Sequence, residues 1–249
     1  MQVLIVHCHP EPRSFNGALK AIAVETLEGL GHSVEVSDLY AEDFDPVERP
    51  AHYPARAEPA VFSALTEQRH AFEAGTLPGD VQRELTRLAR ADLVILQFPL
   101  WWHGLPALLK GWFDRVCVYG GVYSGSRRYD RGRFRGTRAI ASVTTGSPAA
   151  AFTRHGRGGD MATLLWPLHC SLYYLGMDVL APHVVYGVQG GGLSYQAEAA
   201  FRDHLETEKH AWAQRLARLD RDPALPFSSW QDWDEHGVLK ADHPLAWRP

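Results

Sequence analysis

Hydrophobic positions along the chain fall into short runs that alternate with segments of helical periodicity. Residues 3–6, 93–98 and 137–145 are rich in apolar side chains, as are strands buried on both faces of a parallel sheet. Residues 33–39 alternate between polar and apolar side chains, which is typical of an outer strand, and residues 178–188 supply a fifth strand. The pattern predicts an α/β fold with a doubly wound, five-stranded parallel sheet.

Helical segments connect the predicted strands, and their apolar residues recur every three or four positions. They cover residues 15–30, 80–89, 105–116, 160–176 and 197–219. A polar, proline-rich insertion at 40–59 and a weakly amphipathic segment at 60–74 separate the second strand from the third. Residues 1–220 are therefore expected to form one domain. The irregular tail at 221–249 is expected to pack on that domain or on a partner subunit.

The third predicted strand ends in an aromatic turn. Pro99 cannot donate a ladder hydrogen bond and is expected to stop the strand, after which Leu100 leads into Trp101, Trp102 and His103. In open α/β sheets, ligands bind beyond the carboxyl ends of the strands, which is where this turn lies. We therefore interpret the turn as a flat ligand-binding surface. The alternative is that the two tryptophans pack under the following helix.

The loop after the first strand has the features of an anion site. It runs from His9 to Asn16 and passes into a helix, with Ser14 placed as the N-cap. A helix N-terminus presents unpaired N–H groups and the positive end of the helix dipole, so phosphate binds there readily. Neither a Rossmann glycine fingerprint nor a Walker loop is present. An ordinary capped helix is the alternative, but the position at the end of the first strand favours phosphate binding.

The fourth strand also ends in residues suited to a ligand. Thr144, Thr145, Gly146 and Ser147 are small, so their backbone N–H groups can approach a bound molecule closely. The loop at 119–136 is rich in glycine and arginine. An RNA-binding patch is one interpretation of it, but a cationic rim on a cofactor site fits an acidic protein better.

Composition narrows the class of protein. The 249-residue chain has a formal net charge of −4, which argues against nucleic-acid binding as its main task. Its three cysteines stand alone in the sequence, which favours a reduced, cytoplasmic setting. No run approaches the ~18 apolar residues of a membrane span. His169 and Cys170 would point apart on a helix, so no metal site is predicted.

Together these segments resemble the NAD(P)H:quinone oxidoreductases, the DT-diaphorase group. The likeness is carried by HPEPRSFNGALK at 9–20, SDLYAEDFDP at 37–46, FPLWWHGLPALLKGWFDRV at 98–116, YDRGRFRGTRAIASVTTG at 129–146 and GDMATLLWP at 159–167. The resemblance implies a flavodoxin-like homodimer that carries FAD, with FMN less favoured, and that uses NAD(P)H as co-substrate.

The resemblance also assigns roles to individual residues where the motifs match. The FAD phosphates and ribitol would be held by His9, Arg13, Ser14, Phe15 and Asn16. The isoalloxazine would lie against Pro99, Leu100, Trp101 and Trp102, with Thr144, Thr145, Gly146 and Ser147 along its other edge. Asp114 would meet the partner subunit's flavin, and the substrate would face Trp102, His103 and Tyr123.

The chain departs from the family pattern around the flavin's charged edge and the substrate loop. The family's tyrosine and histidine fall at Phe152 and Gly158, whose side chains donate no hydrogen bond, although Phe152 is still expected to contact the cofactor. One of two substrate-loop tyrosines becomes Gly125. We hypothesise that Arg154 or His155 supplies the missing positive charge, assisted by backbone N–H groups. The alternative is that the backbone alone suffices.

The sequence therefore predicts an FAD-dependent NAD(P)H dehydrogenase that passes hydride, by a ping-pong mechanism, to a quinone or similar acceptor. One alternative is the reduction of azo, nitroaromatic or free flavin acceptors. Another is a flavin-bound regulatory partner of a transporter, as some relatives are for potassium-efflux systems. We expect a cytoplasmic homodimer that binds no nucleic acid and does not insert into a membrane.

Overall fold

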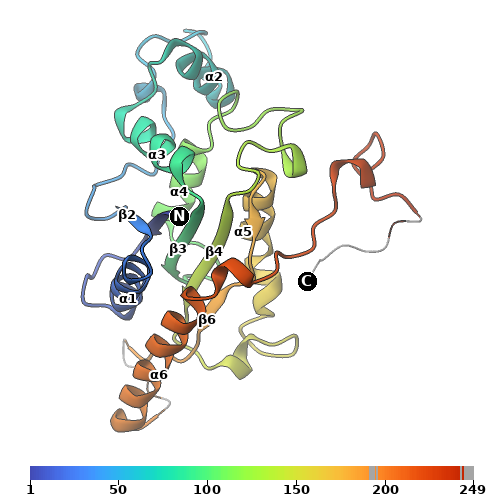
Figure 1. Cartoon of the computed structure of the whole chain (residues 1–249). Helices are drawn as coiled ribbons and strands as arrows, with labels where there is room; N and C mark the ends of the chain where they lie inside the picture. Colours follow the sequence, from blue (N-terminus) through green and yellow to red (C-terminus); the bar gives the residue numbers. More distant parts are fainter. Residues whose placement is uncertain (191–193, 195, 242, 244–249) are drawn as a thin grey trace.

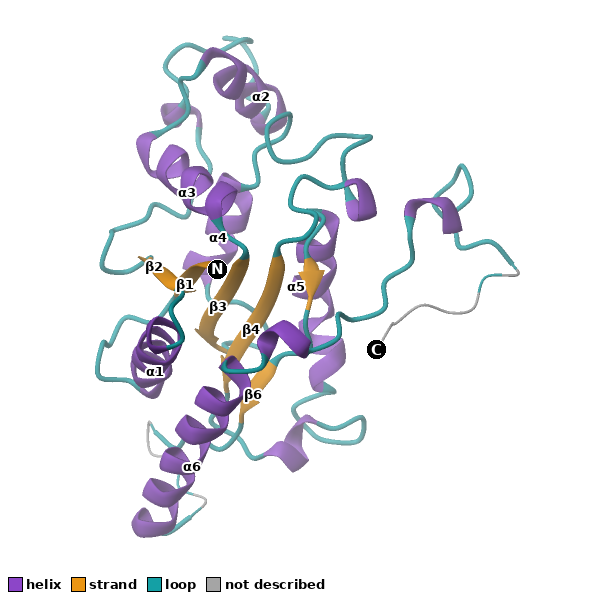
Figure 2. Cartoon of the chain, in the orientation of Figure 1, coloured by secondary structure: helices purple, strands orange, loops and turns teal. Residues whose placement is uncertain are grey.

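One parallel sheet organises the chain (Figures 1 and 2). The computed structural model describes residues 1–190, 194, 196–241 and 243. The strand order is β2-β1-β3-β4, followed by β5 and β6, which both pair with β4. The strands are β1 (Gln2–His7), β2 (Ser33–Asp38), β3 (Leu93–Pro99), β4 (Arg138–Thr144), β5 (Asp178–Val179) and β6 (His183–Val185). Every pairing is parallel, which confirms the predicted sheet.

The fifth position of the sheet is built differently from the continuous strand predicted at 178–188. β5 pairs with the first residues of β4, and β6 pairs with its last three. Pro182, which has no N–H to donate, lies between them, and Leu180 forms a bridge to Ala224 in the tail. The strand is therefore split, and it ends at Val185.

Helices cover both faces of the sheet. They are α1 (Phe15–Gly29), α2 (Ala64–Ala74), α3 (Gly79–Arg90), α4 (Ala107–Val116), α5 (Met161–Tyr174) and α6 (Glu198–Leu216). Alternate residues of β1 point to opposite faces, as the strand period requires. Val3 and Ile5 join a cluster with α1 and α6, whereas Leu4 and Val6 join a larger cluster with α3, α4 and α5.

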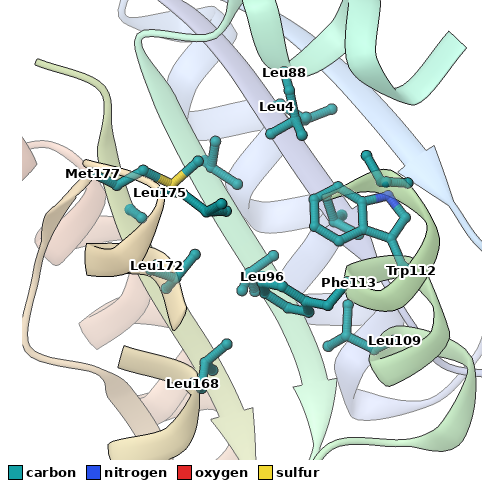
Figure 3. Close-up of a cluster of buried hydrophobic side chains, with 14 of the residues drawn as sticks. Leu4, Leu88, Leu96, Leu109, Trp112, Phe113, Leu168, Leu172, Leu175 and Met177 are labelled. Carbon is teal, nitrogen blue, oxygen red and sulfur yellow. The ribbon is translucent and has the colours of Figure 1, made fainter. Parts of the chain in front are cut away.

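The larger cluster is the main core, and Figure 3 shows its centre. Leu96 from β3 lies between side chains of α4 and of α5 such as Trp112 and Leu172. The buried indole of Trp112 donates to the Glu84 carboxylate at 2.8 Å, which also accepts from Ser37 at 2.8 Å. This buried carboxylate is therefore hydrogen-bonded, as a charge in a core must be.

Two element boundaries differ from prediction at proline residues. β3 includes Pro99, which pairs with Thr144, so the proline is the last residue of the strand and does not stop it earlier. A proline is tolerated at this terminal position, and the ladder continues one step because Leu100 N–H donates to the Thr144 carbonyl at 2.9 Å. Pro106 is the N-cap of α4, which therefore begins two residues later than predicted.

The insertion and the tail both contact the rest of the domain. A Cβ on Gly111 of α4 would lie 2.2 Å from the Pro46 carbonyl oxygen, so the insertion packs directly on that helix. In the tail, the Ser228 carbonyl accepts from Tyr173 of α5 at 2.5 Å, and Trp230 N–H donates to Asp130 at 2.8 Å. The tail was predicted to span 221–249, and its residues 242 and 244–249 lie outside the described residues. Among the helices described, none has the length and apolar character needed to cross a bilayer.

Candidate functional site

The loops that follow β1, β3 and β4 meet at one edge of the sheet, and buried Asn16 ties them together. Its amide nitrogen donates to the Thr144 hydroxyl at 2.8 Å. Its amide oxygen accepts from the Gln97 side chain at 2.8 Å. Asn16 is only 3% exposed, so it connects α1 to the ends of β3 and β4. The three loops are thereby held in a fixed relation.

The loop from His9 to Ser14 presents the N-terminus of α1. Ser14 caps the helix, with its hydroxyl accepting from Gly17 N–H at 3.1 Å, as predicted. His9 Nδ1 accepts from Glu11 N–H at 3.1 Å, and Arg13 pairs with Glu11 at 3.0 Å. The hydrogen bonds from Arg13 lower the pKa of the Glu11 carboxyl to about 2. Because Arg13 is exposed, its guanidinium can turn towards an anion at the helix end.

The aromatic turn after β3 has an uncommon backbone. Trp102 and His103 have φ angles of 51° and 60°, in the left-handed region. Trp101 and Gly104 exchange backbone hydrogen bonds of 3.2 and 3.0 Å, which close the turn. A left-handed conformation costs a non-glycine residue about 1–2 kcal/mol, and two in succession mark a strained segment. Such strain is concentrated at functional sites, where the surrounding structure maintains it.

This backbone points the Trp102 side chain out of the protein. Its indole is 98% exposed, which is extreme for the largest apolar side chain. Trp101 is less exposed and lies with its ring 6.0 Å from the ring of His9, next to the loop at α1. The turn therefore presents a flat, exposed aromatic surface beside the loop at the N-terminus of α1. It does not place the two tryptophans under the following helix.

The segment after β4 lies at the same edge of the sheet. Thr144 and Thr145 are almost fully buried, and the Thr145 hydroxyl donates to the Ser147 carbonyl at 2.9 Å. Thr145 N–H donates to Val185 of β6, and Gly187 N–H donates to Ser147, both at 2.9 Å. These bonds hold the turn around Gly146 against the last strand.

The next loop contains the two departures from the family, and they are neighbours. Gly158 N–H donates to the Ala151 carbonyl at 2.8 Å. A Cβ on Gly158 would lie 2.9 Å from the Phe152 ring, so this ring occupies the space beside the glycine. Phe152 also contacts Tyr186, with ring centroids 5.8 Å apart. Arg154 and His155 are exposed on the same loop, so their proposed role beside the cofactor stays a prediction.

Sequence reasoning did not single out Tyr186, which directly follows β6. Burial and the nearby Asp160 carboxylate raise the pKa of its phenol. The strand predicted at 178–188 placed Tyr186 inside the sheet, so its position just after the end of β6 could not be recognised from the sequence.

A cleft of about 1010 Å³ lies beyond the aromatic turn, between α4 and α5. It brings together three predicted residues, His103, Asp114 and Tyr123, in its lining. Tyr123 also contacts Tyr174 of α5, with ring centroids 5.4 Å apart. Tyr174 and Trp166 of α5 line the cleft and were missed from sequence because their helical spacing resembles ordinary core packing. The volume is at the upper end of the range for small-molecule sites.

Comparison with known proteins identifies this architecture. Residues 1–214 match a protein family described as having a flavodoxin-like fold. The chain is 40% identical over 227 residues to ribosyldihydronicotinamide dehydrogenase (quinone) of Pongo abelii, covering 90% of this chain and 94% of that protein. The chain belongs to the NAD(P)H:quinone oxidoreductase family. It is therefore an oxidoreductase, and the resemblance noted from the sequence motifs is confirmed.

Other members of the NAD(P)H:quinone oxidoreductase family align similarly. NAD(P)H dehydrogenase (quinone) 1 of Cavia porcellus is 41% identical over 189 residues, 75% of this chain and 69% of that protein. The crystal structure of a putative quinone reductase from Klebsiella pneumoniae has a TM-score of 0.87 and 33% identity, and the match covers 98% of each chain. Membership in this family implies a flavin cofactor and a nicotinamide co-substrate.

The residues at the sheet edge fit a flavin. The partly exposed Trp101 beside His9 offers an aromatic face, and the α1 terminus and the Gly146 turn offer backbone N–H groups for phosphate and for a polar ring edge. The strained backbone under Trp102 is a cost that a ligand-binding role explains.

Proposed function

We propose that this protein is an FAD-dependent NAD(P)H dehydrogenase that transfers hydride to a quinone or a similar acceptor in two successive half-reactions. The observation that carries the proposal is the strained turn that exposes Trp102 between the α1 terminus and the cleft at His103. Its relatives from Pongo abelii and Cavia porcellus are named quinone dehydrogenases, which supports the same reaction class.

Different parts of the chain would hold different parts of the cofactor. The α1 terminus, with His9, Arg13 and Ser14, would bind the phosphates through N–H groups and positive charge. Leu100 and Trp101 would support the ring system, and the Thr145–Ser147 turn would contact its polar edge. The bound flavin supplies the hydride-accepting chemistry. The protein positions the nicotinamide and then the acceptor over Trp102, and the apolar cleft keeps water away.

Steady-state NAD(P)H oxidation tests this proposal directly. We expect rapid oxidation when a quinone is present and slow oxidation without it. Faster turnover with azo, nitroaromatic or free flavin acceptors than with quinones would assign the protein to that other acceptor class. This comparison matters because the chain departs from the family pattern at Gly125, Phe152 and Gly158. Negligible turnover with every acceptor would support the regulatory partner instead.

The purified protein is expected to contain tightly bound FAD rather than FMN. This expectation rests on the resemblance to the FAD-carrying DT-diaphorase group, because the phosphate of FMN could also bind at the α1 terminus. Mass spectrometry of the flavin released on denaturation measures this directly. FMN in the released fraction would correct the cofactor, whereas a colourless protein that takes up neither flavin would remove the flavoenzyme assignment.

Gly17→Ala is expected to weaken flavin binding by about tenfold or more. A Cβ at Gly17 would lie 2.0 Å from the Pro12 carbonyl oxygen, so the loop from His9 to Ser14, here called the anion loop, must move. Small displacements of a binding loop carry costs of about this size. Gly29→Ala is the matched control in the same helix, because its Cβ would meet no atom within 4 Å. Fluorescence titration of the apoprotein with FAD compares them, and equal affinities would show that the loop does not bind the phosphates.

We also infer a homodimer with the flavin at the subunit boundary. Trp101, Trp102 and Leu65 are large exposed apolar side chains, and Leu65 lines the cleft together with Asp114. A second copy would cover this surface, and Asp114 would then face the partner's flavin. Equilibrium sedimentation should give twice the chain mass at working concentrations. A monomer that retains full activity would contradict the inference.

A further inference from the structure

A second cavity, of about 390 Å³, lies between α5, the turn at Tyr129 and the tail. Its walls are largely aromatic and include Tyr129, Tyr173, Phe227, Trp230 and Trp233. The volume is within the range of small-molecule sites. The cavity adjoins the larger cleft through Trp166 and Cys170, which line both, but it includes neither the aromatic turn nor the anion loop.

Arg128 lines this cavity, and among residues 1–190, 194, 196–241 and 243 it forms no ion pair with a carboxylate. Its guanidinium lies 5.3 Å from the Trp230 ring centroid and 5.6 Å from that of Tyr174. It donates to the Tyr174 hydroxyl at 3.2 Å, but its buried Nε has no hydrogen-bond partner in the described part of the chain. The residue is half-buried, and a buried N–H donor left without a hydrogen bond is unfavourable, which its contacts with aromatic faces do not correct.

The acidic residues of the cavity wall do not neutralise this guanidinium. Asp234 accepts from the backbone N–H groups of His236 and Val238, both at 2.9 Å, so its carboxylate closes its own turn. The Glu235 side chain is 83% exposed and lies 3.8 Å from His236. The cavity therefore combines flat aromatic walls with an arginine whose donors are largely unused.

We propose that this cavity binds a planar aromatic anion, such as an aryl carboxylate or aryl sulfonate. The ring would lie against the tryptophan and tyrosine walls, and the anionic oxygens would accept the free N–H groups of Arg128. Arginine is suited to this role because its planar fork matches two oxygens at once. The site goes beyond the proposed redox function, because binding here requires neither hydride transfer nor NAD(P)H.

Isothermal titration of the flavin-loaded protein with three related compounds tests the two requirements of the site. We expect 2-naphthoate to bind about tenfold or more tightly than neutral 2-naphthamide, because only the anion pairs with Arg128. Cyclohexanecarboxylate should bind at least about tenfold more weakly than 2-naphthoate, because it lacks a planar ring. Equal affinities of the naphthoate and the amide would overturn the proposal.

Two variants locate the binding. Arg128→Gln should weaken 2-naphthoate about tenfold and leave 2-naphthamide unchanged, whereas Arg131→Gln should change neither by more than about threefold. Arg131 is the matched control because it stacks 4.9 Å from the same Trp230 ring but does not line the cavity. Trp233→Leu, which alters this cavity and not the larger cleft, should weaken both naphthalenes.

The variants also separate this proposal from the redox function. If Arg128→Gln fails to fold, the ligand series and Trp233→Leu still decide the outcome. Naphthoate affinity that survives both Arg128→Gln and Trp233→Leu would place the binding elsewhere and overturn the proposal. Because quinone-dependent NAD(P)H oxidation is measured without naphthoate, failure of this site leaves the test of the proposed function intact.

Discussion

Trp102→Ala is expected to slow both half-reactions by about tenfold to a hundredfold while leaving flavin content near normal. We infer that the exposed indole forms one wall of the pocket that the nicotinamide and the acceptor would occupy in turn. Loss of an aromatic wall removes stacking worth about 0.5–1.5 kcal/mol, and poor positioning adds to this loss. The anion loop is a separate element, so the cofactor phosphates keep their contacts.

Stopped-flow measurement of each half-reaction, together with the flavin-to-protein ratio, checks this expectation. Trp102→Phe is the matched variant, because it keeps an aromatic face and should recover most of the rate. A protein that loses its flavin but turns over normally per bound flavin would show that Trp102 supports the cofactor only. The folded state should hardly change, because a side chain that is 98% exposed contributes little packing.

The double variant Arg154→Ala, His155→Ala is expected to reduce its flavin about a hundredfold more slowly with NAD(P)H. Hydride transfer places negative charge on one edge of the flavin, and a charged donor there is worth on the order of 3 kcal/mol. Phe152 and Gly158 offer no such donor, whereas both exposed residues lie on the same loop. Backbone N–H groups at Gly146 and Ser147 would assist.

The two single variants and Arg157→Ala complete this experiment. Arg157 is exposed on the same loop and is the matched control, with little expected effect. If all variants changed the reduction rate by less than about threefold, only the backbone account would stand. The flavin reduction potential gives an independent readout, because loss of a positive charge should make the bound flavin harder to reduce.

The fold was largely predictable because its apolar pattern is strong. The runs at 3–6 and 93–98 can be buried on both faces only in a covered parallel sheet, and they form β1 and β3. The split at Pro182 was not predicted, because the apolar pattern continues across the break and one proline decides the local hydrogen bonding. Pro99 was expected to stop the strand because it has no N–H group, but the last residue of a strand does not need to donate one, so Pro99 still pairs with Thr144.

The sequence predicted which segments form the candidate site better than it predicted the contacts and backbone angles of their residues. Asn16 was singled out as a phosphate donor, yet its buried amide links Gln97 and Thr144, a contact between residues more than 80 positions apart. The positive φ angles at Trp102 and His103 could not be foreseen, since glycine or asparagine usually signals them. Tertiary packing determines both features, and no local pattern encodes it.

The left-handed pair at Trp102 and His103 has a consequence for protein engineering. An Asn-Gly pair adopts the same tight turn with little strain, so it should raise the melting temperature of this protein. A directed-evolution campaign that selects for heat resistance alone would therefore enrich such replacements and discard the indole. Libraries built on this scaffold should hold these two codons constant, or screen every thermostable variant for turnover before carrying it forward.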